Sequence, residues 1–98
     1  MDIKKVKSNS TMTVLISGRV DTSTSPILEN ELKNSFDGCE YMVLDFADVE
    51  YISSAGLRVL LSSHKVMSKK GGMKLKNVSD DVMEIFEVTG FSEILDIV

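Results

Sequence analysis

Two adjacent serines, Ser53 and Ser54, join an apolar run to an amphipathic stretch within the segment YISSAGLRVLL at residues 51–61. A serine hydroxyl becomes a nucleophile when a neighbouring base takes its proton. The only histidine, His64, lies about three helical turns beyond Ser54, roughly 15 Å at ~1.5 Å per residue. It cannot act as that base, and the segment does not match the G-x-S-x-G elbow of hydrolases. The serine pair is therefore unlike a hydrolytic centre.

Two other roles remain for the serine pair. Serine is a favoured N-cap residue, because its side-chain oxygen accepts a hydrogen bond from a backbone N–H in the first helical turn. A cap uses only one hydroxyl, which leaves the second one free. The carboxyl end of a central strand is also where α/β sheets expose their working residues. One hydroxyl is thus a candidate for interaction with another molecule.

The other polar residues favour neither a metal site nor a cofactor site. Asp45, Asp48 and Glu50 lie close together, but no second cluster or histidine pair completes a set of ligands. Neither of the phosphate-binding glycine patterns, G-x-x-x-x-G-K and G-x-G-x-x-G, occurs. The single cysteine, Cys39, has no neighbour that would make it a nucleophile. We therefore expect no metal, no cofactor and no enzymatic activity.

Alternating strands and helices must position these serines. A hairpin is expected at the N-terminus, and Ser25 followed by Pro26 is typical of a helix start with a capping hydroxyl. The order implies one α/β domain over residues 1–98, with a mixed, mostly parallel central sheet of four to five strands and covering helices. The expected strands are 3–7, 12–17, 41–46 and 73–78, with 93–98 as a last strand or docking segment. A loop at 47–52 precedes a helix that runs to about residue 70, and a short helix follows Ser79.

Charge and hydropathy limit the location and the partners. The net charge is −4 and the basic residues form no single stripe, which argues against a nucleic-acid partner. No apolar run approaches the ~20 residues that cross a bilayer, and the N-terminus lacks the apolar core of a signal peptide. A lone cysteine fits a reducing compartment. We expect a cytoplasmic protein without membrane insertion.

Three longer segments cover nearly the whole chain, in order and without large gaps. They are SGRVDTSTSP, VLDFADVEYISSAGLRVLL and KKGGMKLKNVSDDVMEIFEVTGFSEILDI. Together they resemble the STAS domain family, in particular its single-domain bacterial anti-sigma factor antagonists. The resemblance implies a STAS-like fold and a role in transcription regulation by partner switching.

In that family the unphosphorylated antagonist binds an anti-sigma factor that is also a serine kinase, and the sigma factor is released. The kinase phosphorylates one serine of the antagonist, which then dissociates, and a phosphoserine phosphatase resets it. The phosphorylated serine commonly lies two residues before the glycine of Asp-Ser-Ser/Thr-Gly. The resemblance therefore implies phosphorylation at Ser54. Ser53 stands at the usual aspartate position and is either the fallback acceptor or the helix cap.

The resemblance also implies a partner-binding surface around Ser54. Gly56 would let a partner backbone approach closely, and Arg58 on the first helical turn would contact the partner. The loop at 21–24 either borders this surface or is a polar turn with an extra cap. The full expected surface consists of Asp21, Thr22, Ser23, Thr24, Ser53, Ser54, Ala55, Gly56 and Arg58.

A second function stays open beside the antagonist. STAS domains share one fold and differ in the surface that carries their function. The chain is alternatively a STAS adaptor subunit of a transporter or sensor complex, with no sigma-factor role. The serine retained before Ala55 and Gly56 favours the antagonist.

Overall fold

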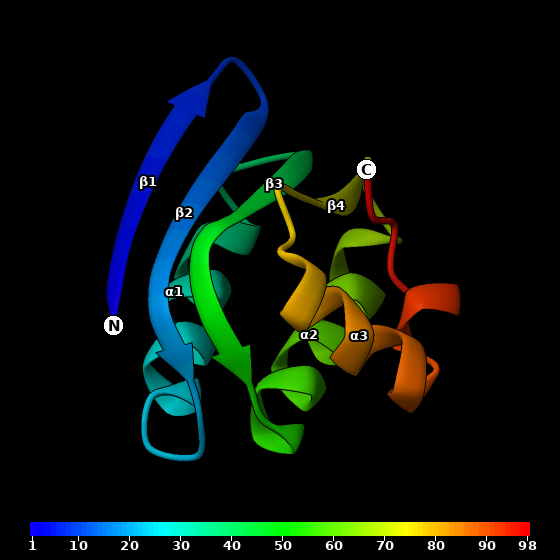
Figure 1. The fold of residues 1–98 in the computed structure, drawn as a ribbon. Helices are drawn as coiled ribbons and strands as arrows, with labels where there is room; N and C mark the ends of the chain where they lie inside the picture. The colour runs from blue at the N-terminus through cyan, green and yellow to red at the C-terminus, as the bar shows by residue number, and fades with distance from the viewer.

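Four strands form one sheet in the order β1-β2-β3-β4, and β1 is its antiparallel edge strand (Figure 1). The other neighbours pair in parallel. The computed structural model describes all 98 residues. Its elements are β1 (Asp2–Ser8), β2 (Thr11–Val20), α1 (Ser25–Phe36), β3 (Tyr41–Ile52), α2 (Ser54–Met67), β4 (Gly72–Lys76), α3 (Asp80–Thr89) and the 3-10 helix η1 (Phe91–Glu93). The predicted α/β fold with a mixed, mostly parallel sheet is confirmed, with four strands.

One side of the sheet carries the hydrophobic core. The register pairs Val14 with Leu44 and Leu44 with Leu75, so these fully buried side chains form a row on the same side. Burial of each such side chain contributes about 1.5–3 kcal/mol. The helices complete a single cluster of 20 buried residues, to which they contribute Leu28, Leu32, Leu57, Val59, Leu60, Met67, Val82 and Phe86. The core therefore fixes how the helices lie against the sheet.

The strand β3 is longer than the sequence pattern predicts. Residues 47–52, expected as a loop, continue the strand as far as Ile52. Val49 and Ile52 are buried, whereas Asp48 and Glu50 are exposed, so the acidic residues simply point to solvent. The pairing with β2 is irregular between Leu15 and Ser17. The prediction of a loop was wrong because charged residues on the open side of a strand resemble those of a loop.

The helix α2 ends earlier than expected, at Met67 rather than about Lys70. The Nζ of Lys70 donates hydrogen bonds to the carbonyl oxygens of Phe36 and Cys39, the second at 2.7 Å. Next to it, the N–H of Gly71 donates to Glu40 O at 2.7 Å. These bonds turn the chain away from the helix axis and into β4.

The two ends of the chain are held at different places on the sheet (Figure 1). A Cβ on Gly18, near the end of β2, would lie 3.4 Å from the Cα of Met1. At the other end, residues 93–98 form no further strand. They dock by a single parallel bridge between Ile97 and Leu75, where the N–H of Val98 donates to Leu75 O at 3.0 Å. Of the two expectations for this segment, docking is correct.

Gly56 marks the close approach of α2 to the sheet. A Cβ at this position would lie 2.7 Å from side-chain atoms of both Ile52 and Val20. We expect Gly56→Ala to lower the free energy of unfolding by about 1–3 kcal/mol, as overpacking does. Urea denaturation measures this loss.

Gly38→Ala is the matched control. The nearest atom to a Cβ on Gly38 is the Ser35 carbonyl oxygen, at 3.7 Å, which is an ordinary contact. Its effect should stay within about 0.5 kcal/mol, as is usual for surface positions. Equal losses in the two variants would contradict the packing role of Gly56.

Candidate functional site

Ser53 and Ser54 have different surroundings, although they are neighbours. Ser53 has an extended backbone and is the N-cap of α2, where its Oγ accepts a hydrogen bond from the N–H of Gly56 at 3.4 Å. Its own N–H donates to Val20 O at 2.8 Å, which ties the start of α2 to the end of β2. The side chain and the backbone of Ser53 are therefore both engaged within the chain.

Ser54 is the first residue of α2 and its side chain is exposed. The Ser54 hydroxyl takes part in no hydrogen bond of the chain, unlike that of Ser53. The first N–H groups of a helix lack partners within it and give this end a partial positive charge. The site thus offers a free hydroxyl at a position that favours negative charge.

The loop between β2 and α1 is organised by one carboxylate oxygen. The Oδ1 of Asp21 accepts hydrogen bonds from the backbone N–H groups of Ser23 and Thr24, both at 3.0 Å, and from the Ser23 hydroxyl at 2.8 Å. The Ser23 hydroxyl, followed by the backbone N–H of Thr24, lowers the pKa of Asp21 below its ordinary value. Thr22 is exposed and its side chain points to solvent. The loop is therefore a hydrogen-bonded turn with free hydroxyl surface on its outside.

Ser25 does not cap α1, contrary to the sequence expectation. It is the first helical residue, and Thr24 occupies the N-cap position without a capping hydrogen bond from its side chain. The Ser25 hydroxyl is buried and donates to Asp21 O at 2.6 Å, whereas the Thr24 hydroxyl donates to Arg19 O at 2.7 Å. Both hydroxyls hold the preceding loop, which is why neither serves the helix.

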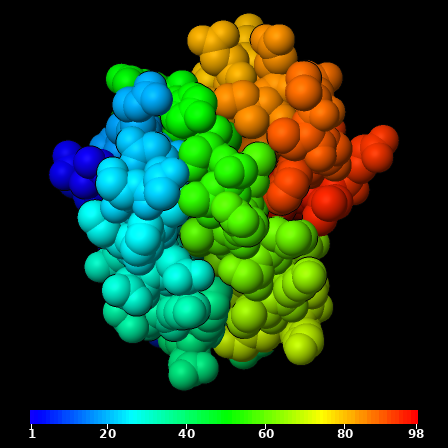
Figure 2. Space-filling model, turned by 90° about the horizontal axis from the view of Figure 1, so that it is seen from below, coloured from blue at the N-terminus to red at the C-terminus, as the bar shows by residue number.

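The two loops meet at the carboxyl edge of the sheet, because β2 and β3 are parallel and Val20 pairs with Ile52. Figure 2 shows the light-blue loop at 21–24 beside the green start of α2. Between α1 and α2 lies a shallow hollow of about 270 Å³, and its lining includes Thr22, Ser25, Pro26, Glu29, Ala55 and Arg58. The residues predicted from the sequence are thus brought to one end of the molecule. Gly56 lies buried beneath this surface.

Sequence reasoning missed a pair of side chains beside the site. Arg19 and Tyr51 face each other in the register of β2 and β3, with the Arg19 Cζ 4.4 Å from the centre of the Tyr51 ring. A guanidinium over an aromatic face is attracted by the ring's negative face. Glu29 and Pro26 of the hollow were missed as well. No local motif signals these contacts, because each depends on strand register or on how two helices pack.

Two single residues considered for chemistry, Cys39 and His64, take no part in the serine site. The Cys39 thiol is buried and donates to Ser35 O at 3.3 Å, and burial raises the pKa of Cys39. His64 lies half-buried on α2, and its Nδ1 has no hydrogen-bond partner. Neither residue adds a nucleophile or a base to the surface around Ser54.

The chain contains no group of three or more histidine, cysteine, aspartate or glutamate side chains that is arranged to hold a metal ion. None of its helices has the length and apolar character to cross a bilayer.

This fold and site define a small α/β domain that displays hydroxyls at the carboxyl edge of its sheet. Residues 2–98 match the family described as STAS domain, and the chain belongs to that family. It is 31% identical over 98 residues to the anti-sigma-B factor antagonist of Bacillus subtilis, an alignment that covers 99% of this chain and 88% of that relative. The predicted family is confirmed.

Solved structures show the same fold. The crystal structure of an anti-sigma factor antagonist from Mycobacterium paratuberculosis superposes with a TM-score of 0.89 at 22% identity, covering 98% of this chain and 83% of the other. The phosphorylated form of the Bacillus cell fate determinant SpoIIAA superposes with a TM-score of 0.75 at 13% identity, covering 99% and 91%. The STAS fold is thus adopted by chains that differ widely in sequence.

The pH dependence of Asp21 tests the structure of its loop. A carboxylate whose pKa is lowered on folding stabilises the folded state above its unfolded pKa. This contribution is lost as the pH falls through the lower, folded-state pKa. We expect a carbon-13 NMR titration of Asp21 to have its midpoint below the ordinary value of 3.8.

Ser23→Ala should move that midpoint up towards the ordinary value, because the Ser23 hydroxyl is the strongest cause of the lowered pKa. Ser54→Ala removes a hydroxyl from the same end of the molecule and should leave the midpoint unchanged. A midpoint at or above 3.8 in the unaltered chain would show that the hydrogen bonds to Asp21 are not formed in solution.

Proposed function

We propose that the chain is an anti-sigma factor antagonist that is switched off by phosphorylation of Ser54. The observation that carries this proposal is the exposed, unbonded hydroxyl of Ser54 at the start of α2. Ser53 takes the capping role, so Ser54 is free to react without loss of the cap. The name of the Bacillus subtilis relative, anti-sigma-B factor antagonist, supports the same class.

The surface around Ser54 suits a docking role that phosphorylation can reverse. A phosphate adds about −1.5 to −2 charges at the positive end of α2. The helix dipole favours this charge by only ~0.3–1 kcal/mol, so the domain keeps its fold. Pressed into a desolvated interface to which the docking partner contributes no cation, the same dianion costs several kcal/mol. Since each ~1.4 kcal/mol is a factor of ten, binding falls by about two orders of magnitude or more.

The proposed switch requires two partners, a kinase that phosphorylates Ser54 and a phosphatase that removes the phosphate. The unphosphorylated chain binds an anti-sigma factor that is also a serine kinase, through the loop at 21–24 and through Ser53, Ser54, Ala55 and Arg58, with Gly56 buried beneath them. The kinase transfers phosphate to Ser54, and a phosphoserine phosphatase removes it. The chain itself acts by binding and not by catalysis, because no base lies beside Ser54. These events take place in the cytoplasm.

Phosphorylation is tested by incubating the chain with a candidate anti-sigma factor kinase from the same genome, ATP and Mg²⁺. Mass spectrometry should find one added phosphate, on Ser54. Ser54→Ala should abolish it, and Ser53→Ala, the matched control, should retain it. Full phosphorylation of Ser54→Ala would move the acceptor to Ser53 or elsewhere.

Binding to the same kinase tests the switch. Ser54→Ala should bind with the affinity of the unaltered chain, because alanine is small and uncharged. Ser54→Asp should bind at least about tenfold more weakly, since it places a charge in the interface. Isothermal titration calorimetry measures both. Equal affinity of Ser54→Asp and the unaltered chain would contradict the switch, and binding to a transporter alone would support the adaptor function.

A further inference from the structure

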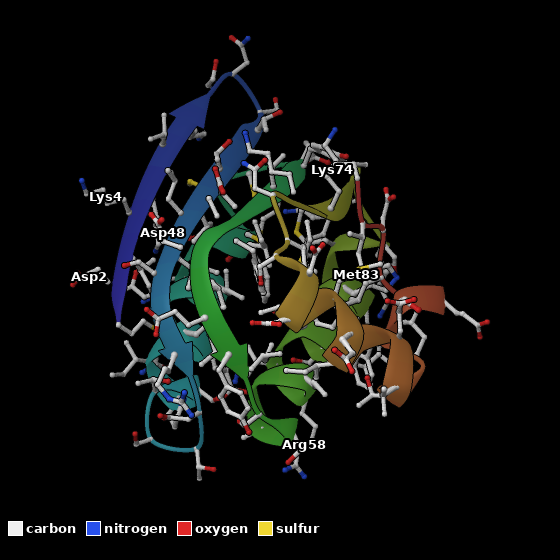
Figure 3. The ribbon with its side chains drawn as sticks, viewed as in Figure 1. Asp2, Lys4, Asp48, Arg58, Lys74 and Met83 are labelled. Carbon is white, nitrogen blue, oxygen red and sulfur yellow. The ribbon has the colours of Figure 1, made fainter.

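Arg58 is a cation without a partner at the edge of the site. It is the fifth residue of α2 and is exposed. The chain's two ion pairs join Lys5 to Glu31 at 2.7 Å and Lys33 to Glu29 at 3.9 Å, so neither involves Arg58. Figure 3 shows its side chain extending beyond the start of the helix into open space. Nothing within the folded chain accounts for its charge.

We propose that Arg58 binds the phosphate of phosphorylated Ser54 within the same molecule. This inference rests on the proposed phosphorylation of Ser54. The two residues are four apart on α2, and side chains with this spacing are neighbours on one helix face, with Cβ atoms about 5–6 Å apart. Helical side chains also lean towards the N-terminus, which directs Arg58 towards Ser54. The order is the favourable one, with the anion N-terminal to the cation.

The chemistry of the two groups fits a direct contact. A guanidinium presents paired N–H donors that match two phosphate oxygens at once. The phosphate also lies among the N–H groups of the first turn of α2, so it is attracted from two directions. Both groups start exposed, and pairing them desolvates neither completely.

The other cations are less suited to this role. The only other arginine, Arg19, is stacked on the ring of Tyr51 at 4.4 Å. On α2 the next basic residues are His64 and Lys65, in its last turn. Arg58 is therefore the one unengaged guanidinium at this end of the molecule.

The contact changes what phosphorylation does to the docking surface. In the unphosphorylated chain Arg58 lines the hollow together with Glu29, where its charge is available to a partner. In the phosphorylated chain the guanidinium turns to Ser54 and away from the hollow, whereas Glu29 keeps its ion pair with Lys33. Phosphorylation then adds an anion to the surface and also withdraws a cation from it.

The test uses the full chain with phosphoserine placed at residue 54 during translation, so it requires no kinase. A phosphorus-31 NMR titration measures the second pKa of the phosphate, ordinarily about 6. Because Arg58 favours the dianion, we expect Arg58→Gln to raise this pKa by roughly half a pH unit. Arg19→Gln, the matched control, removes the other guanidinium and should raise it much less.

A second measurement needs no substitution. In the phosphorylated chain the Arg58 side-chain N–H resonance should shift with pH as the phosphate titrates. In the unphosphorylated chain the same resonance should stay unchanged over that pH range. Amide spectra of the variants establish that they are folded. Equal phosphate pKa values with and without Arg58, or an Arg58 resonance that ignores the phosphate, would overturn the contact. Either result would refute the Arg58 contact and leave the proposed phosphorylation of Ser54 untouched. Conversely, if no kinase phosphorylates Ser54, the proposed function fails, but the contact can still be measured in the chain with phosphoserine built in.

Discussion

The parallel pairing of β2 with β3 is the constraint on which the site depends. Because Val20 pairs with Ile52, both strands end at the same edge of the sheet, and the loops that follow them emerge side by side. Ser53 strengthens this junction through its backbone bond to Val20, and Gly56 allows α2 to close on the two strands. These contacts hold the start of α2 in place without any hydrogen bond from the side chain of Ser54.

The polar groups at this end of the molecule are of two kinds, those bonded within the chain and those that face solvent. Asp21, Ser53 and the hydroxyl groups of Ser23 and Thr24 bond to the chain itself and hold its shape. Ser54 and Arg58 lack such bonds and face solvent. Such a surface loses little conformational entropy when a partner docks, because its backbone is already ordered. Under the proposed function, a change of charge there would alter docking and leave the fold in place.

Much of the fold follows from sequence because its signals are local. The alternation of strands and helices and the capping hydroxyl of Ser53 are each set by a few neighbouring residues. The second half of β3 was not predicted as strand, because its acidic residues, which lie on the open side of the sheet, resemble those of a loop. The stacking of Arg19 on Tyr51 could not be predicted, because the register of two strands brings together residues that are distant in sequence. The site residues came from family resemblance, and only their gathering at one edge required the structure.

The placement of the chain ends has a consequence for how this domain can be joined to other polypeptides. Met1 lies beside Gly18, close to where β2 delivers the chain to its loop, whereas Val98 is bonded to β4 at Leu75. A bulky fusion ahead of Met1 would lie near the end of β2, on the side of the proposed docking surface. The same cargo attached after Val98 would project from the region of β4, away from the proposed docking surface. The two termini therefore differ, since the C-terminus suits the attachment of another polypeptide and the N-terminus lies nearer the proposed docking surface.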